Sequence, residues 1–252
     1  MEASQAFVLA VVQGLTEWFP VSSSAHLVAF QRFLGMKASV AFDVMLHLGT
    51  LFAVIYFLRK DLIELMKFKR NNEKMFAYII IGSLPIAFFG FLFKNFFEFF
   101  FSSSIAVGIA LIINGLILYS TKFFQSKRKM NFFDSFLIGI AQVFSLFPGI
   151  SRSGITISTA LVRGINKTTA YKFSFFISIL PIIGAALMKS GEIDFSQESL
   201  ETFLIGISVS GLVGYVALKT IARIVLKGSF YKFAYYCWIF GIIVLALSFN
   251  MT

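Results

Sequence analysis

The chain has few charged residues, two histidines and a single cysteine. Charged residues make up only 13% of the 252 positions, about half the share found in ordinary soluble domains. Cys237 cannot form an internal disulfide, and it lacks neighbours at the spacing of a metal site. We therefore expect it to be a packing residue. The scarcity of charge argues against a soluble globular protein.

Apolar residues make up most of the chain. They account for 58% of the chain, and phenylalanine alone occurs 34 times, which is more apolar surface than a soluble domain of this length can bury. The sequence predicts an all-α, polytopic membrane protein that forms a single integral membrane domain over residues 1–252. About six segments approach the 20 or so apolar residues that a full span needs. They are residues 40–58, 75–92, 105–120, 172–188, 203–222 and 233–249.

The net charge of +10 is concentrated in short connections between these segments. Residues 59–74 carry six basic and three acidic side chains, and residues 122–129 and 219–232 each carry four basic and no acidic ones. Lysine and arginine mark cytoplasmic connections, where they also meet anionic lipid heads, so the charge needs no nucleic-acid partner. Residues 94–103 and 189–201 lack the basic excess and are expected outside.

This alternation of sides leaves two apolar stretches, residues 5–34 and 132–162, that begin and end on one side. Each has two arms too short for two crossings, separated by a proline followed by serines. We interpret both as re-entrant helical hairpins, one entering from outside and the other from inside. Irregular backbone survives at membrane depth only where protein or a wet cavity surrounds it, so the two hairpin tips are expected to meet near the midplane.

The two hairpins are similar in sequence and are predicted to have opposite orientations. This pattern predicts inverted-topology repeats at approximately residues 5–121 and 132–250, each with a re-entrant hairpin and transmembrane helices. The residues that recur in the same order are Gln13, Ser22, Ser24 and Gly35, matched by Gln142, Ser151, Ser153 and Gly164.

The first tip lies in residues 13–26, Gln-Gly-Leu-Thr-Glu-Trp-Phe-Pro-Val-Ser-Ser-Ser-Ala-His. An ionisable side chain at bilayer depth costs roughly 2.5 to 3.5 kcal/mol on insertion scales, so this cluster indicates function. Ser22, Ser23 and Ser24 open the second arm of the hairpin, where free backbone amides favour an anion. Serine is also an ordinary helix cap, and capping alone would explain the triplet.

The second tip lies in residues 147–156, Phe-Pro-Gly-Ile-Ser-Arg-Ser-Gly-Ile-Thr. Ser151, Ser153 and Thr156 repeat the hydroxyl pattern. Arg152 adds a planar guanidinium suited to bidentate contact with phosphate oxygens. Two helix N-termini and one arginine that converge on one point predict a phosphate or diphosphate site.

Two ionisable residues of the first hairpin are candidates for the chemistry. Glu17 lies one helical turn after Gln13, and it either holds Mg²⁺ or Ca²⁺, with the Gln13 amide oxygen as a second ligand, or acts as a general base. His26 follows Ser22 by one turn and is expected to reach the Ser23 hydroxyl. It would then activate the serine, act as the nucleophile or protonate a leaving oxygen.

Three further polar residues are expected to support the site. Asp43 and His47 share a helix face in residues 40–58, where they either support the site or satisfy each other. Asp134 opens the second hairpin, where a carboxylate at a helix start is favourable. The phenylalanines in residues 96–101 indicate an interfacial or lipid-facing surface.

Together these motifs resemble those of the undecaprenyl pyrophosphate phosphatases, a family that confers bacitracin resistance. The resemblance covers essentially the whole chain. It rests on the Gln13-x3-Glu17 pair and on Phe-Pro-Val-Ser-Ser-Ser-Ala-His at residues 19–26. It rests also on Phe-Asp-x3-His-x-Gly-Thr at residues 42–50 and on Ile-Ala-Gln at residues 140–142, which leads to Pro-Gly-Ile-Ser-Arg-Ser-Gly-Ile-Thr.

The resemblance implies a membrane enzyme that removes the terminal phosphate of an undecaprenyl-type diphosphate and so recycles the lipid carrier for cell-envelope glycan synthesis. It implies a required divalent cation, a substrate met at the outer face of the cell membrane, and a catalytic set of Glu17, Ser23, His26 and Arg152. The family often carries glutamate where this chain has Gln13, which removes one negative ligand. Its Ser-Thr-Gly-His is Ser-Ser-Ala-His here.

A transporter or flippase for an anion or phospholipid head group is the alternative, because inverted repeats with broken helices are also a transporter plan. Transport gives no reason for Glu17 and His26 to flank the serines, so we favour hydrolysis. The expected partners are the membrane and a polyprenyl diphosphate. A homodimer is compatible with the sequence, which does not fix the oligomeric state.

Overall fold

The computed structural model describes residues 1–33, 35, 38–67, 70–125, 127–192, 194, 196 and 198–249. The predicted end of the second repeat, residue 250, lies outside them. In the described part of the chain, six helices are long and apolar enough to cross a membrane, which confirms the predicted class. They are α3 (Val40–Phe57), α5 (Arg70–Leu92), α7 (Ser104–Ser120), α10 (Lys167–Met188), α11 (Leu200–Lys227) and α12 (Phe233–Phe249).

Some helices extend past the predicted apolar segments. Helix α11 continues through Lys219 and Arg223 and ends where Gly228 adopts a φ of 76°, the left-handed conformation typical of a helix end. Long basic side chains can reach the membrane surface from within the last turns of a helix. A charged residue therefore does not mark the end of this helix, although it marks the end of the apolar segment.

Two short helices, α4 (Arg59–Met66) and α6 (Lys94–Phe101), lie in segments predicted as connections. One face of α6 is exposed, with Phe99 71% accessible, as the predicted lipid-facing surface requires. The opposite face packs on the second tip, because the Phe97 and Phe100 rings meet the Phe147 ring at centroid distances of 5.1 and 5.0 Å. The aromatic cluster therefore also supports the second hairpin.

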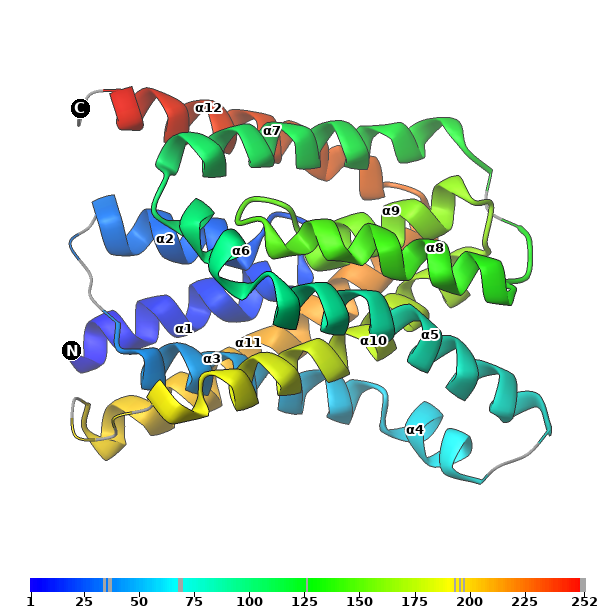
Figure 1. Cartoon of the computed structure of the whole chain (residues 1–252), viewed down its shortest axis with the longest axis horizontal. Helices are drawn as coiled ribbons and strands as arrows, with labels where there is room; N and C mark the ends of the chain where they lie inside the picture. Colours follow the sequence, from blue (N-terminus) through cyan, green and yellow to red (C-terminus); the bar gives the residue numbers. More distant parts are fainter. Residues whose placement is uncertain are drawn as a thin grey trace.

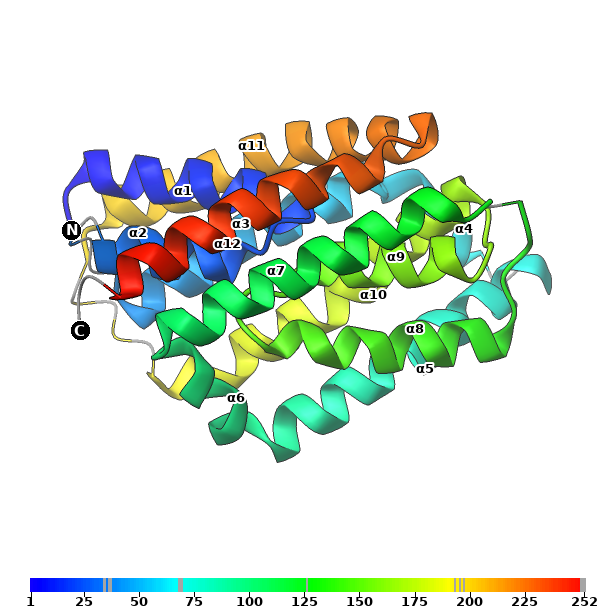
Figure 2. The ribbon, with the colours of Figure 1, turned by 90° about the horizontal axis from the view of Figure 1, so that it is seen from above.

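Both predicted hairpins are present. The first consists of α1 (Ala3–Trp18) and α2 (Ser23–Phe33), and the second of α8 (Phe132–Val143) and α9 (Arg152–Val162). They enter from opposite ends of the molecule, and their turns overlap in its middle (Figure 1). The start of α1 and the end of α12 both lie at the end from which the first hairpin enters (Figure 2).

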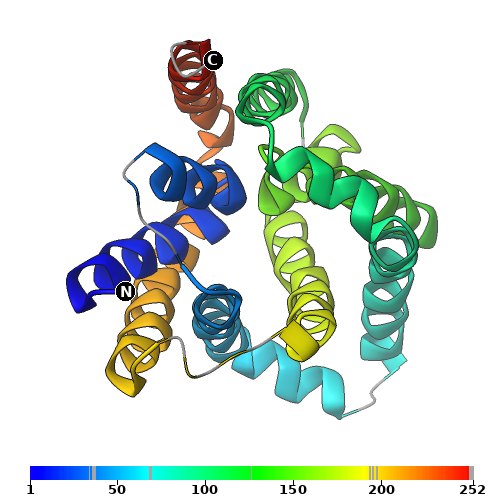
Figure 3. The ribbon, with the colours of Figure 1, turned by 60° about the vertical axis from the view of Figure 1, so that its left-hand side comes forward.

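Each hairpin packs against a helix from the other half of the chain. Helix α1 lies along α11, and α8 lies along α5, on opposite sides of the molecule (Figure 3). Helices α7 and α12 run side by side, and α3 contacts α10. Such packing of each hairpin on the other half of the chain is what the predicted inverted repeats would produce, and the repeats and their boundaries remain a prediction.

Helices α3 and α11 approach each other closely at Gly49. A Cβ atom at this position would overlap the Ser210 hydroxyl and lie 2.5 Å from the Ile207 carbonyl oxygen. Small residues allow such contacts between membrane helices. We expect Gly49→Ala to destabilise the protein by roughly 1 to 3 kcal/mol because the helices must separate, and thermal unfolding in detergent measures the loss.

Gly184→Ala is the matched control for Gly49→Ala. Gly184 also lies in a helix, but an added Cβ would meet no atom within 4 Å. Alanine favours a helix over glycine, so this variant should melt at or slightly above the wild-type temperature. Equal melting temperatures for the two variants would contradict the close approach at Gly49.

Candidate active site

The first tip (residues 19–22) reverses the chain between α1 and α2. Pro20 prevents α1 from continuing. Ser22 follows with a φ of 68°, and among the described residues no other non-glycine has a positive φ. This turn makes Ser23 the first residue of α2 and brings its hydroxyl back to α1, where Oγ donates to Glu17 Oε2 at 2.6 Å.

The second tip (residues 147–151) turns the chain between α8 and α9. Gly149 has a φ of 114°, and Ser151 caps α9 by accepting a hydrogen bond from the Gly154 amide at 3.1 Å. Arg152 is therefore the first residue of α9, and its guanidinium points to the first hairpin. Nη2 lies 3.6 Å from Glu17 Oε1, and Nη1 donates to the Ser178 carbonyl at 3.3 Å.

The two tips contact each other directly. The Gly149 amide donates to Ser22 Oγ at 3.1 Å, and Ser153 Oγ donates to the Trp18 carbonyl at 3.0 Å. Fully buried Asn114 on α7 bridges them, donating to the Pro20 carbonyl at 2.8 Å and accepting from the Ser151 amide at 3.1 Å. We did not predict this role of Asn114, although an amide within an apolar span was a usable signal.

The Glu17 carboxylate and the four side chains around it form a cluster of five side chains from four helices. They are Gln13 and Glu17 of α1, Ser23 of α2, His47 of α3 and Arg152 of α9.

Hydrogen bonds connect this cluster. Gln13 Nε2 donates to Glu17 Oε2 at 3.1 Å and lies 2.8 Å from His47 Nδ1. The Glu17 side chain is only 5% exposed, whereas those of His47 and Arg152 are 34% and 24% exposed. The cluster thus joins a buried carboxylate to an accessible guanidinium, an arrangement that can receive an anion and accept a proton beside it.

Residues 6–243 match the family described as bacitracin resistance protein BacA. The chain belongs to the BacA family. It is 40% identical to an undecaprenyl-diphosphatase of Carboxydothermus hydrogenoformans, with 98% of each chain covered. It is 41% identical to one of Caldicellulosiruptor bescii, over 98% of this chain and 97% of the relative. The corresponding protein of Korarchaeum cryptofilum is 37% identical over 98% of this chain and all of its own length.

The predicted contact between His26 and the Ser23 hydroxyl is wrong. In this BacA-family chain His26 Nδ1 lies 2.8 Å from the Ser22 carbonyl oxygen, and Nε2 lies 2.7 Å from the Tyr236 hydroxyl. The ring stacks on Phe240 at a centroid distance of 4.3 Å and is almost completely buried. Both ring nitrogens are therefore engaged away from Ser23.

Most hydroxyls predicted to bind phosphate make hydrogen bonds within the protein, and their contact with phosphate stays a prediction. They belong to Ser22, Ser24, Ser151, Ser153 and Thr156. Thr156 Oγ1, for instance, donates to the Arg152 carbonyl at 2.8 Å and lies 2.6 Å from Ser174 Oγ. The capping alternative is confirmed for Ser151, and within the two serine clusters it is Ser23 that bonds to Glu17.

The three supporting residues have different surroundings. His47 lies within the cluster itself, closer to the chemistry than predicted. Asp43 accepts a hydrogen bond from Gln31 Nε2 at 3.5 Å rather than pairing with His47.

Cys237 is buried beside Asn114, which donates to its sulfur at 3.3 Å, so the predicted packing role is confirmed.

Asp134 stabilises the open end of the second hairpin, where α8 begins and α9 ends, instead of supporting the site. Its buried carboxylate accepts hydrogen bonds from Arg128 at 2.7 Å, Arg163 at 3.1 Å and the Asn131 amide at 3.0 Å. Burial raises the pKa of Asp134, but these hydrogen bonds outweigh it and hold the pKa below its ordinary value. The helix-start interpretation is confirmed.

The cluster offers oxygen ligands to a divalent cation. Gln13 Oε1 is buried without a hydrogen-bond partner, and it is Nε2 that faces Glu17. A half-turn of the amide would bring Oε1 beside the Glu17 carboxylate and the Ser23 hydroxyl. Mg²⁺ is commonly held by one or two carboxylates together with substrate phosphates, so this set fits such an ion. The described residues contain no group of three or more acidic, histidine or cysteine side chains that would hold a metal without the substrate.

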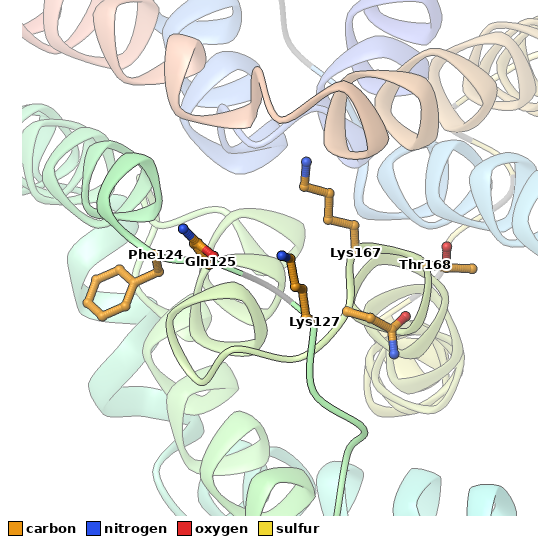
Figure 4. A pocket seen from close by; sticks show the side chains of 6 residues that line it. Phe124, Gln125, Lys127, Lys167 and Thr168 are labelled. Carbon is orange, nitrogen blue, oxygen red and sulfur yellow. The ribbon is translucent and has the colours of Figure 1, made fainter.

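Two cavities are lined by residues outside the cluster. One of about 520 Å³ opens among the basic connections, where Lys127 and Lys167 are among the residues that line it (Figure 4). Another, of about 540 Å³ and mostly apolar, lies below the first tip and is lined in part by Phe19, Lys232 and Tyr236. Neither is lined by Glu17, Ser23 or Arg152.

Proposed function

We propose that the protein hydrolyses an undecaprenyl-type diphosphate to the monophosphate and inorganic phosphate at the outer face of the cell membrane. The observation that carries this proposal is the Ser23 hydroxyl 2.6 Å from the Glu17 carboxylate, with the Arg152 guanidinium beside them. The names of relatives that align over nearly the full length support the same activity. Transport alone would not require a serine aligned with a buried base.

Substrate binding begins with the guanidinium of Arg152. Its fork can hold two oxygens of the terminal phosphate, and its position at the start of α9 adds the backbone amides of a helix N-terminus. When bound, a divalent cation held by Gln13, Glu17 and the phosphate oxygens would supply further positive charge. The lipid chain stays among the apolar helices while the head group reaches the cluster.

The first half of the reaction transfers the phosphoryl group to Ser23. Its oxygen attacks the terminal phosphorus while Glu17 accepts the hydroxyl proton. A bond from Ser23 Oγ to phosphorus forms, and the bond from phosphorus to the bridging oxygen breaks. The lipid monophosphate leaves with the bridging electrons, and Arg152 stabilises the charge spread over the equatorial oxygens.

The second half returns Ser23 to its starting state. Glu17 gives its proton to the departing lipid monophosphate and then accepts one from a water molecule that attacks the phosphoserine. The bond between phosphorus and Ser23 Oγ breaks, Glu17 returns the proton taken from water to Ser23 Oγ, and inorganic phosphate leaves. Because all five side chains come from one chain, a homodimer would leave this chemistry unchanged.

Phosphate release from a short-chain polyprenyl diphosphate by the purified protein in detergent tests the proposal. We expect release with Mg²⁺ or Ca²⁺, a fall of at least about tenfold with chelator, and recovery when metal is restored. No release from folded protein under any condition would contradict hydrolysis, and anion or lipid flux across liposomes would then test transport. Phosphate release at an unchanged rate in the presence of chelator would contradict only the cation site.

Gln13→Glu refines the metal experiment. The substitution adds a second carboxylate beside Glu17, which strengthens the ligand set for Mg²⁺. We expect half-maximal activity at a lower Mg²⁺ concentration than in the wild type. An unchanged or higher requirement would show that residue 13 is not a ligand.

A further inference from the structure

The backbone of Ser22 is the strained part of the first tip. A non-glycine residue in the left-handed region costs of order 1 to 3 kcal/mol and persists only when its surroundings enforce it. Ser22 adopts this conformation with a φ of 68°, directly before the residue whose hydroxyl meets Glu17. Whatever holds Ser22 therefore also sets the direction of the Ser23 side chain.

Ser22 is held first by the start of α2, which follows it. Its carbonyl oxygen accepts the His26 backbone amide at 3.3 Å, and its hydroxyl accepts the Ala25 amide at 3.4 Å and lies 3.0 Å from Ser24 Oγ.

Two further contacts hold Ser22 from different sides. Its hydroxyl accepts the Gly149 amide of the second tip at 3.1 Å, and its carbonyl oxygen lies 2.8 Å from His26 Nδ1. A carbonyl oxygen can only accept, so Nδ1 carries the hydrogen and Nε2 is free to accept from the Tyr236 hydroxyl at 2.7 Å. The histidine is thus fixed in one tautomer.

Tyr236 reaches His26 from the far end of the chain. It lies on α12, where its ring stacks on those of His26 and Phe240 at centroid distances of 5.7 and 5.9 Å. It also forms part of the wall of the apolar cavity below the first tip. Hydrogen bonds at both ring nitrogens and the stacked rings of Tyr236 and Phe240 leave His26 little freedom to turn toward Ser23.

We propose that His26 and Tyr236 are positioning residues, which hold the Ser22 carbonyl and thereby direct the Ser23 hydroxyl at Glu17. The inference rests on the proposed function, and it assigns His26 a role without proton transfer to substrate. The histidine acts through Nδ1 on the backbone, and Tyr236 acts through Nε2 on the histidine. The nucleophile is aligned by a pair that does not touch the reacting atoms.

Asparagine and glutamine at position 26 separate this role from acid–base catalysis. An asparagine amide places its nitrogen near the position of Nδ1 and can still donate to the Ser22 carbonyl, whereas a glutamine amide resembles the Nε2 end of the ring. Neither amide can act as an acid or base. A positioning role therefore predicts that the two variants differ, and a proton-transfer role predicts that they fail together.

The test compares His26→Asn, His26→Gln and Tyr236→Phe with Tyr235→Phe, in which a neighbouring tyrosine on α12 loses its hydroxyl. Small displacements of a reacting group can cost up to about 10²-fold in rate. We expect kcat to fall about 10- to 100-fold in His26→Gln and severalfold in Tyr236→Phe, with KM within about twofold of wild type. His26→Asn should retain most of the wild-type kcat, and Tyr235→Phe all of it.

Several results would overturn the proposal. An equal fall of kcat in His26→Asn and His26→Gln would indicate that His26 acts as an acid or base. A raised KM without a fall of kcat would indicate that His26 contacts the substrate. Wild-type kcat in every variant, with lower melting temperatures alone, would reduce the pair to structural packing. An inactive wild-type protein would refute the proposed function itself, so the two failures are distinguishable.

Discussion

Ser23→Ala is expected to lower phosphate release by at least about 10³-fold, the scale on which removal of a nucleophile acts. The variant removes the oxygen that attacks phosphorus, yet it deletes only one atom from a half-buried position. Its melting temperature should therefore stay close to that of the wild type. Phosphate release and thermal unfolding, measured on one preparation, separate the two effects.

Acid quenching during turnover gives the same prediction a second measurement. The wild type should retain phosphate on Ser23, and Ser23→Ala should retain none. Ser145→Ala is the matched control, because the Ser145 hydroxyl only caps the Gln142 carbonyl at 2.7 Å in the other hairpin. Wild-type turnover in Ser23→Ala would show that Ser23 is not the nucleophile and that water activated by Glu17 attacks the phosphorus.

Arg152→Ala should lower kcat/KM by roughly 10³-fold or more, as expected when a phosphoryl group loses the guanidinium that neutralises it. The nearest oxygen of Glu17 is 3.6 Å from this guanidinium, so its removal also leaves the buried carboxylate without its arginine partner. Lysine at this position keeps the charge but not the fork, and Arg152→Lys should recover only part of the loss. Steady-state kinetics with the short-chain substrate measure both variants.

Arg163→Ala is the control for Arg152→Ala. Arg163 caps the opposite end of α9 and pairs with Asp134 at the open end of the hairpin. Its loss should lower stability but leave kcat/KM near the wild-type value. Equal kinetic defects in the two arginine variants would show that α9 as a whole, and not the Arg152 guanidinium, is needed.

The spans and hairpins were predictable because the signals for them are local. Apolar length identifies a span, and the charge of a connection identifies its side, without any knowledge of tertiary contacts. The meeting of Glu17 with Arg152 was predictable for another reason. Two proline-serine tips that enter from opposite sides have one region in common, the midplane, and a charged residue there must be buried by the other tip.

The detailed directions of side chains were not predictable. A count of residues along an ideal helix places His26 near Ser23, but the left-handed turn at Ser22 precedes that helix and directs the histidine to Tyr236. No property of residues 22–26 indicates a partner on α12. Likewise, serine composition cannot separate a cap from a ligand, because both uses need the same hydroxyl at the same helix start.

The packing of α1 along α11 has a consequence for synthesis. Helix α11 begins at Leu200, so the first hairpin leaves the ribosome long before the helix that covers it. Until then its buried polar residues, Gln13 and Glu17 among them, need temporary partners such as water, lipid heads or an insertion factor. Contacts this distant along the chain form slowly. Assembly of the cluster is therefore a late event, and a chain halted before residue 200 would have both tips but no helix for α1 to pack on.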